Sequence, residues 1–255
     1  VYKRQGQPYD PLASPDFDRR PNQRDDLMDK SISLELAYED IDVQTCNVTG
    51  VIEGTDPAVS DQYVVLGAHL DHIAPVGGQV ANGADDNASG SAGVLEIAEA
   101  IAMNPFRRPV IVALWTGEEM GALGSQFFLD HSPVPPSKFK AYVNLDMIGR
   151  STPENKKTRT QYVVGIGDSI SAFEDLVDSV NQATVQWPIE FRANYGLSDH
   201  ASFHNRGVLA LSLYAGHHED VHKPTDDWEL IDFMKVEKVS RLAYWLTREL
   251  ADRHW

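Results

Sequence analysis

The sequence predicts an α/β fold in which helices cover both faces of a mostly parallel central sheet. The first observation is a series of short apolar runs rich in β-branched residues, such as Tyr63–Ala68 and Val110–Trp115. Runs of this kind are typical of strands buried on both faces. The second observation is that segments with apolar residues at helical spacing alternate with these runs. The 255 residues are enough to bury the core of one large domain of this class.

The expected elements follow one another along most of the chain. Residues 47–53 predict a first strand, and the turn sequence at 54–57 ends it. The strand at 63–68 runs into a Gly-rich loop, 77–90, and apolar residues at helical spacing then predict a helix within 89–103. After it we expect, in chain order, a strand at 110–115, a helix beginning within 121–129, strands at 139–145 and 161–166, a helix at 169–184, a loop and short helix within 194–205, a strand at 208–214 and a closing helix at 231–252.

We predict a division of the chain at residue 24. Residues 1–24 are polar and contain four prolines, which indicates an extended arm or a truncated leader. Residues 25–255 are expected to form a single domain, although 25–41 fit neither helical nor strand spacing well. The chain begins without methionine and without a basic segment followed by an apolar one. We therefore expect a processed form whose export signal has been removed.

The composition excludes several classes of partner. Acidic residues outnumber basic ones by 38 to 22, which gives a formal net charge of −16. This charge disfavours nucleic acid and anionic membranes as partners. No apolar run approaches the ~18 residues of a membrane-spanning helix. Cys46 is the only cysteine, so a disulfide within the chain and a thiolate zinc site are excluded. Any metal would need histidine and carboxylate ligands.

Two adjacent acids, Glu118 and Glu119, follow the predicted strand 110–115 after a Thr-Gly turn. Carboxylates at the end of a buried strand are costly unless a cation or a proton pairs with them. The carboxyl ends of strands are also where open α/β sheets bind their ligands. We therefore expect one of these glutamates to bind a metal and its neighbour to handle a proton.

Further side chains that can bind a metal follow other predicted strands or lie in loops: His69, Asp85, Asp86, Asp146 and His222. The carboxyl ends of parallel strands share one edge of a sheet, so these groups should converge with Glu119. Two histidines and three carboxylates exceed the ligands of one tetrahedral zinc ion. They suit two ions that each have one histidine and one terminal carboxylate and that share a bridging carboxylate. Zinc fits such ligands, with manganese or cobalt as possible substitutes.

Six segments together resemble the motif set of the co-catalytic dizinc aminopeptidases, and they occur in that family's order. The family includes secreted bacterial leucyl aminopeptidases of the aminopeptidase S type, and glutamate carboxypeptidase and glutaminyl cyclase are relatives. The similarity extends from about residue 47 to residue 227. The matching segments are AHLDH (68–72), GADDNASG (83–90), TGEEMGALGS (116–125), NLDMIG (144–149), YGLSDHASFHN (195–205) and HKPTDD (222–227).

The resemblance implies two zinc ions and five protein ligands. The ligands would be His69 and Asp146 on one ion, Glu119 and His222 on the other, and Asp86 between them. Asp86 is preferred over Asp85 because the family's bridging acid lies three residues before the serine of a Ser-Gly pair, here Ser89. The resemblance also implies a cis peptide bond after the bridging residue, between Asp86 and Asn87.

The resemblance assigns three further residues to positions around the metals. Glu118 would act as the general base and then as the general acid. Asp71 lies two residues after His69 and would orient the imidazole ring. Tyr195, three residues before Ser198, would donate a hydrogen bond to the developing oxyanion.

The fold implied by the resemblance is the phosphorylase/hydrolase-like zinc exopeptidase fold, with residues 25–255 as the catalytic domain. The implied activity is hydrolysis of the N-terminal peptide bond of peptides that carry a free amino group, in the periplasm or outside the cell. The alternatives are a zinc carboxypeptidase, an amidase, a glutaminyl-cyclase-like enzyme or a non-catalytic binding domain. A binding domain would be expected to have lost ligands, whereas all five are present here. The oligomeric state cannot be predicted from the sequence.

The remaining histidines are expected to lie at the surface or behind the metal ligands: His72, His200, His204, His217 and His218. The run Ser198-Asp199-His200 is not interpreted as a hydrolase triad, because triads are assembled from distant segments of a chain. Asp199 is expected at most to support the metal site.

Overall fold

The computed structural model describes residues 3–4, 7–8, 44–167, 169–193 and 198–254. The chain separates into two units, Val1–Val43 and Gln44–Trp255. In the first unit, β1 (Lys3–Arg4) pairs antiparallel with β2 (Gln7–Pro8). Most of the predicted arm and all of the stretch 25–41 lie outside the described residues, so the division at residue 24 stays a prediction. The second unit contains the predicted α/β fold.

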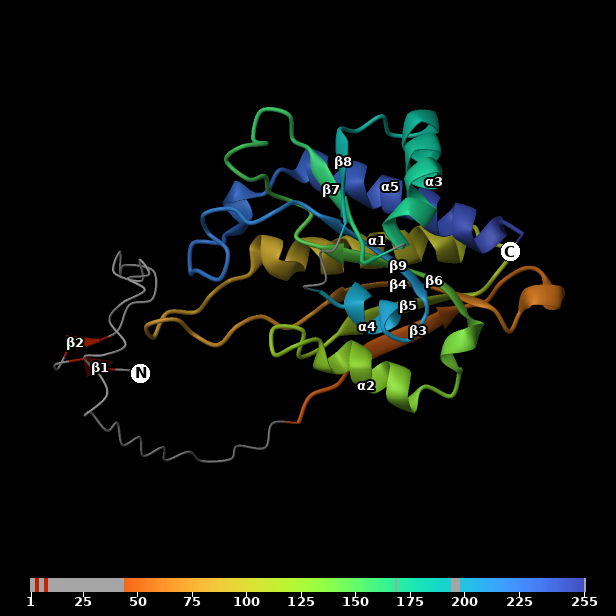
Figure 1. Ribbon diagram of the computed structural model, residues 1–255, viewed down its shortest axis with the longest axis horizontal. Coiled ribbons are helices and arrows are strands. Elements are labelled where there is room, and N and C mark those ends of the chain that lie inside the picture. Colours follow the sequence, from red (N-terminus) through yellow and green to blue (C-terminus); the bar gives the residue numbers. More distant parts are fainter. Residues whose placement is uncertain (1–2, 5–6, 9–43, 168, 194–197, 255) are drawn as a thin grey trace, which may run out of the picture. The chain divides into compact units, whose positions relative to one another are not determined.

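A seven-stranded sheet forms the centre of the second unit, in the order β3-β5-β4-β6-β9-β7-β8 (Figure 1). The four strands β5, β4, β6 and β9 are parallel to one another, while β3 and β7 each pair antiparallel with their inner neighbour. The strands are β3 (Val48–Ile52), β4 (Tyr63–His69), β5 (Val110–Trp115), β6 (Phe139–Asp146), β7 (Gln161–Val164), β8 (Ile189–Arg192) and β9 (Leu209–Tyr214).

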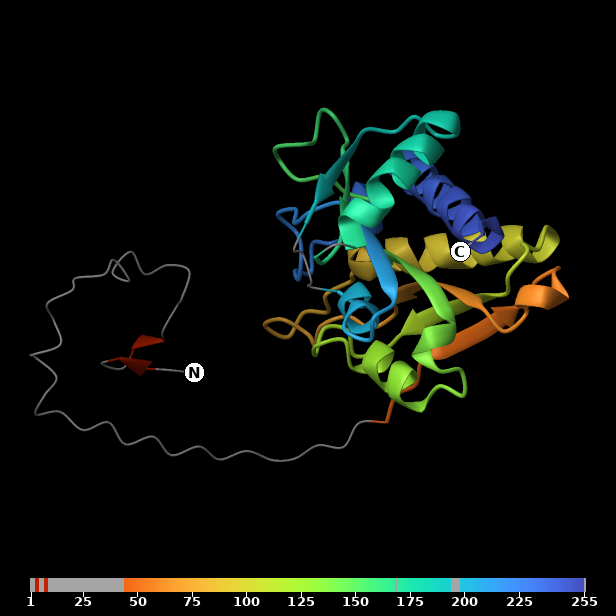
Figure 2. The same ribbon diagram turned by 45° about the vertical axis from the view of Figure 1, so that its right-hand side comes forward.

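Helices cover both faces of this sheet, as Figures 1 and 2 show. One face carries α1 (Gly90–Met103), α3 (Ser169–Ala183) and α5 (Phe233–Asp252). The other face carries α2 (Leu123–His131) and α4 (His200–His204). A short π-helical segment, η4 (Ala84–Ser89), leads directly into α1. Single 3-10 turns occur at Pro57–Val59, Pro136–Lys138 and Trp228–Leu230.

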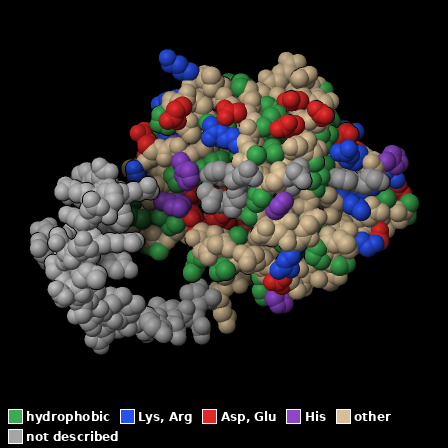
Figure 3. Space-filling model, in the orientation of Figure 1, with side chains coloured by type: hydrophobic (Ala, Val, Ile, Leu, Met, Phe, Trp, Pro, Cys, Tyr) green, Lys and Arg blue, Asp and Glu red, His purple; other side chains and the backbone are tan. Residues whose placement is uncertain are grey.

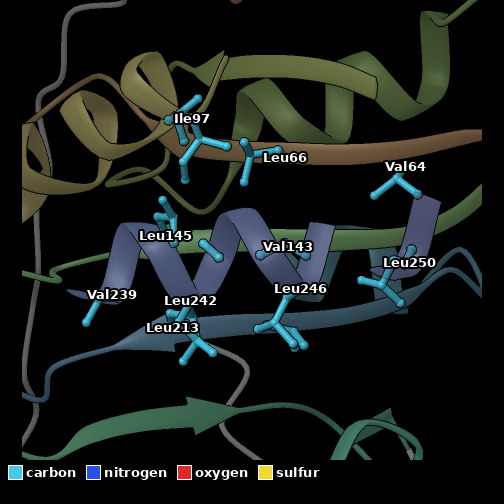
Figure 4. Close-up of a cluster of buried hydrophobic side chains, with 14 of the residues drawn as sticks. Val64, Leu66, Ile97, Val143, Leu145, Leu213, Val239, Leu242, Leu246 and Leu250 are labelled. Carbon is cyan, nitrogen blue, oxygen red and sulfur yellow. The ribbon is translucent and has the colours of Figure 1, made fainter. Parts of the chain in front are cut away.

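The larger core lies between the sheet and the α1–α3–α5 layer. Figure 4 shows strand side chains such as Leu66, Val143 and Leu213 facing Leu242 and Leu246 of α5. All five are fully buried. On the opposite face a second cluster gathers aromatic rings of β5, β6 and α4. Burial on both faces explains why the central strands have continuous apolar sequences instead of an alternating pattern.

The mostly parallel α/β fold predicted from the sequence is confirmed, and the predicted strands and helices lie within a few residues of the observed ones. The one strand of the second unit that was missed is β8. Its four residues alternate between half-buried and exposed side chains at the edge of the sheet, so they lack the apolar run of a central strand. In the part of the chain that the structure describes, no helix is both long enough and apolar enough to cross a membrane.

Candidate metal centre

The parallel strands bring their carboxyl ends to one edge of the sheet. There β4 ends at His69, directly beside Trp115 at the end of β5, and β6 ends at Asp146. The Thr116–Glu119 segment leaves β5 at the same edge. In Figure 3, acidic side chains gather in a hollow near the middle of the face, with histidine side chains on either side. The shared edge of the sheet therefore places His69, Asp146 and the Thr116–Glu119 segment together.

His69 is almost completely buried, with 1% of its surface exposed. Its Nδ1 donates a hydrogen bond to the main-chain oxygen of Asp71 at 3.1 Å, which leaves Nε2 to face the site. Nε2 lies 3.2 Å from Oδ1 of Asp86 and 3.4 Å from Oδ1 of Asp146. Burial lowers the pKa of the imidazole, but these two carboxylates outweigh it and hold the pKa well above its usual value.

The position of Asp86 is fixed by the turn that connects the 77–90 loop to α1. The Asp86–Asn87 peptide bond is cis, as the resemblance implied. The Asn87 side chain donates to the main-chain oxygen of Leu145 at 3.0 Å and accepts from the backbone N–H of Met147 at 3.1 Å. At Gly90 a Cβ atom would lie 2.5 Å from that same Leu145 oxygen, so only glycine allows this approach. The turn is thereby attached to the end of β6.

A second group of ligand atoms faces the other oxygen of Asp86. Nε2 of His222 lies 3.1 Å from Oδ2 of Asp86 and 3.0 Å from Oε2 of Glu119. The loop after β9 carries His222, whose φ is +59° and whose side chain is 48% exposed. Asp86 thus presents Oδ1 to one histidine–carboxylate pair and Oδ2 to another.

These separations fit metal coordination. Ligand atoms about 2.0 Å from a tetrahedral ion lie about 3.3 Å from one another. The four histidine-to-carboxylate distances, 3.2 and 3.4 Å around His69 and 3.1 and 3.0 Å around His222, are close to that value. Imidazole nitrogen and carboxylate oxygen are also the donors that zinc takes in hydrolases. The residues present therefore fit a pair of divalent ions.

His72, expected from the sequence at the surface or behind the ligands, lies close to Glu119. Its Nδ1 lies 3.0 Å from Oε1 of Glu119 and 4.0 Å from Oδ2 of Asp86, and these three residues form a possible metal-binding group. His72 contacts Glu119 on the oxygen opposite the one that faces His222. Its contact with Glu119 spans 47 residues of sequence, so no local pattern could have revealed it.

Glu118 lies next to Glu119 and is half-buried. Burial raises the pKa of its carboxyl to about 9; the charge of His69 opposes this shift, and the charges of Asp146 and Asp199 add to it. The Asp71 carboxylate accepts the backbone N–H of Glu118 at 3.0 Å and that of Glu119 at 3.3 Å. Asp71 thus fixes the segment that carries both glutamates, and it reaches His69 most closely through its main-chain oxygen.

Asp199, whose charge contributes to the raised pKa of Glu118, is completely buried. Burial raises the pKa of Asp199 to about 7, and the nearby Ser125 hydroxyl opposes that shift. A cleft of about 660 Å³ opens beside Glu118 and Glu119, between α2 and α4, and is wide enough for part of a peptide. Tyr195, the expected oxyanion donor, falls within 194–197, outside the described residues, so its role stays a prediction.

The family model of Peptidase family M28 matches residues 47–246, most of the chain. The chain belongs to this peptidase family. This M28 chain is 30% identical over 184 residues to leucine aminopeptidase 2 of Trichophyton equinum, which is 68% of the chain and 34% of that relative. It therefore spans about a third of the length of this curated relative.

Solved structures share the fold of this M28 chain. The LapA aminopeptidase of Legionella pneumophila superposes with a TM-score of 0.66 and 24% identity, over 83% of this chain and 60% of that one. BSAP, a zinc aminopeptidase from Bacillus subtilis, superposes with a TM-score of 0.70 and 22% identity, over 82% of this chain and 51% of that one. At these identities the likeness establishes the architecture alone.

Proposed function

We propose that this chain is a dizinc aminopeptidase that hydrolyses the N-terminal peptide bond of peptides. The observation that carries the proposal is the Asp86 carboxylate, whose two oxygens face two separate histidine–carboxylate pairs at about the spacing of metal ligands. Membership of a peptidase family and the names of the relatives, leucine aminopeptidase among them, support the same activity.

In this proposal each ion has its own terminal ligands and shares Asp86. His69 and Asp146 would hold one zinc, and Glu119 and His222 would hold the other, with manganese or cobalt as possible substitutes. When bound, the pair of ions would supply Lewis-acid charge and lower the pKa of water towards ~7. Asp71 would keep the His69 ring and the Glu118–Glu119 segment in place through the hydrogen bonds described above.

Glu118 would move the proton. Its carboxylate would accept a proton from the attacking water and then give it to the nitrogen of the departing amine. A pKa raised by burial suits this exchange, and the charge of nearby cations would bring it back towards neutral pH. The leaving peptide would then occupy the cleft beside Glu118. Tyr195 would stabilise the oxyanion, a contribution of about 3 kcal/mol for one such donor.

The acidic site would also select the N-terminal end of the substrate. A free α-amino group is cationic, and the carboxylates of Asp86, Glu119 and Asp146 would attract it beside the scissile bond. Peptides with a free N-terminus are therefore the expected substrates. Function outside the cytoplasm, in the periplasm or medium, remains part of the proposal and is supported only by the resemblance to secreted enzymes.

Replacing Glu118 by glutamine tests the proposal. Glu118→Gln should retain both zinc equivalents, while kcat for a leucyl chromogenic amide should fall about 10²–10⁴-fold, because glutamine cannot accept the proton. Zinc content by atomic absorption and steady-state kinetics measure the two quantities. Glu237→Gln, on the exposed face of α5, is the matched control and should leave both unchanged.

A panel of substrates with free and blocked N-termini separates the proposed activity from its alternatives. Wild-type protein should cleave aminoacyl amides with a free amine and leave their N-acetylated forms intact, and a chelator should abolish the cleavage. Cleavage of blocked peptides from the C-terminus, or cyclisation of N-terminal glutamine, would replace the aminopeptidase by one of the related zinc enzymes. Unchanged turnover in Glu118→Gln would remove that residue from the mechanism.

A further inference from the structure

His222 is the one predicted ligand that a loop carries without support from a neighbouring strand. Its side chain is half exposed, yet its Nε2 lies within 3.1 Å of both Asp86 and Glu119. A loop that is open to solvent must be held in place if an imidazole is to stay at such distances, because ordering a free segment costs conformational entropy. The contacts that hold the 216–227 loop therefore determine the position of His222.

Arg150 makes the most direct attachment. It lies four residues after Asp146, and its Nη2 donates to Oδ2 of Asp220 at 2.8 Å. Both side chains are largely buried, 13% and 16% exposed, so the ion pair is shielded from solvent. Hydrogen bonds from Thr225 and, to a lesser degree, from Arg150 hold the pKa of Asp220 below its usual value. Asp220 stands two residues before His222 in the same loop.

Asp220 also organises the interior of the loop. Its Oδ1 accepts a hydrogen bond from Oγ1 of Thr225 at 2.7 Å, and its main-chain oxygen accepts the N–H of Lys223 at 3.0 Å. The Asp220 side chain therefore connects both sides of the turn that presents His222, and Arg150 anchors this side chain to the segment that follows β6.

A separate attachment joins the end of the loop to the bridging ligand. Oδ2 of Asp226 accepts the backbone N–H groups of Asp85 and Asp86 at 3.0 and 3.1 Å, and the main-chain oxygen of Asp226 accepts the N–H of Ala84. This contact positions Asp86, which both ions would share. Arg150 also approaches this carboxylate, with Nη1 3.9 Å from Oδ1 of Asp226, but its hydrogen bond is to Asp220 at 2.8 Å. The hydrogen bonds of Asp226 to the Asp85–Asp86 backbone do not involve Arg150, so the Arg150 side chain acts mainly on the His222 side.

We propose that Arg150, acting through Asp220, is a positioning residue that sets the metal affinity of the Glu119–His222 half of the site and leaves the His69–Asp146 half unchanged. The inference rests on the proposed dizinc function. Its selectivity follows from the main chain: Gly149 N–H donates to Asp85 at 2.6 Å and the Arg150 oxygen accepts from Lys235 at 2.6 Å. These bonds keep the segment after β6 in place when the Arg150 side chain is shortened.

The experiment is a zinc titration of protein that has been stripped of metal. Wild-type protein should bind two equivalents. In Arg150→Ala the first equivalent should bind as in wild type, and the second should bind about 10–100-fold more weakly, the usual effect of losing an outer hydrogen-bond partner of a ligand. Excess zinc should then restore most of kcat. Cobalt spectra during the titration report which equivalent is lost.

Two further variants and a control make the test independent of the alanine variant's folding. Asp220→Asn should weaken the same equivalent, and Arg150→Lys should recover part of its affinity, because lysine keeps the charge but not the planar guanidinium group. Arg241→Ala breaks an exposed ion pair with Glu237 and should change neither affinity. Thermal melting of each metal-free variant reports any general loss of stability.

The outcomes separate this inference from the function on which it rests. Two equivalents in the wild type with unchanged affinities in Arg150→Ala and Asp220→Asn would overturn the inference and leave the dizinc proposal standing. Equal weakening of both equivalents, in step with a lower melting temperature, would also overturn it, since the pair would then be merely structural. A wild-type protein that binds fewer than two equivalents would overturn the proposed dizinc function itself.

Discussion

The two halves of the candidate metal centre are built in different ways. His69 and Asp146 are the last residues of two parallel strands and are 1% and 8% exposed. On the other side, Glu119 follows a turn and His222 lies on a half-exposed loop. The strand half takes its geometry from the register of the sheet. The loop half takes its geometry from side-chain contacts, above all those of Arg150 and Asp226.

The precise placement of the ligands has a different source in each half. A ligand at a strand end is fixed by ladder hydrogen bonds and a packed core, so it can be displaced only by disrupting the sheet. A ligand on a loop can be displaced by losing one contact, because loops have the lowest local stability in a fold. The strand half should therefore be sensitive to burial and charge, and the loop half to its few attachments.

Removing the residue shared by the halves should give the largest effect. In the proposed dizinc site, Asp86→Ala would take a ligand from both ions, so both zinc affinities should fall by more than about 100-fold, beyond the loss of an outer partner. Hydrolysis should become undetectable at micromolar zinc. Calorimetric titration and a leucyl amide assay measure these losses, with Asp178→Ala on the exposed face of α3 as the control. If only one affinity fell, Asp86 would be a terminal ligand and the two halves would be independent.

The next largest effect should be the difference in stability between variants of the two histidines. In metal-free protein, His69→Ala leaves the buried Asp86 and Asp146 carboxylates without their partner, which should cost about 3–5 kcal/mol of unfolding free energy. His222→Ala acts at a half-exposed position and should cost under about 0.5 kcal/mol, although it still removes one zinc equivalent. Urea unfolding of the two variants measures the difference. Equal costs would mean that the loop half is as rigidly built as the strand half.

The sequence could predict the strand half because its information is local. An apolar run followed by His69, or by Asp146, is visible in one segment, and parallel strands make such ends converge. The choice of Asp86 over Asp85 as the bridging ligand could not be made from residue type, because both are aspartates. Only the family resemblance favours Asp86. In the structure Asp85 turns away, with Oδ1 accepting the backbone N–H of Gly149.

The attachments of the loop half could not be predicted. Arg150 and Asp220 are 70 residues apart, and Asp226 reaches back 140 residues to Asp86. Each is an ordinary charged residue in a polar loop, and solvent exposure is the usual expectation for such residues. Their burial and pairing arise from the way the 216–227 loop packs beside the 82–86 segment. No periodic pattern in the sequence indicates this packing.

The smallest expected effect concerns Lys235, which supports the segment that carries Arg150. Its ammonium group is fully buried and donates to the main-chain oxygens of Arg150 and Thr160 at 2.6 and 3.2 Å. Burial lowers its pKa to about 8 from an ordinary value of 10.5. Between these values the unfolded chain holds a proton that the folded protein has released, so stability should rise with pH in that window.

The variant Lys235→Met should lack this rise. From pH 8 to pH 10.5 the unfolding free energy of metal-free wild type should increase by about 3 kcal/mol relative to Lys235→Met, as 2.5 pKa units at about 1.4 kcal/mol each require. Urea unfolding at several pH values measures it. Parallel pH profiles would mean that the buried ammonium is as well solvated by its carbonyl partners as by water. The segment beneath Arg150 would then be held by an ammonium group that stays charged, and the loop half would depend on charge at Lys235 as well as at the Arg150–Asp220 pair.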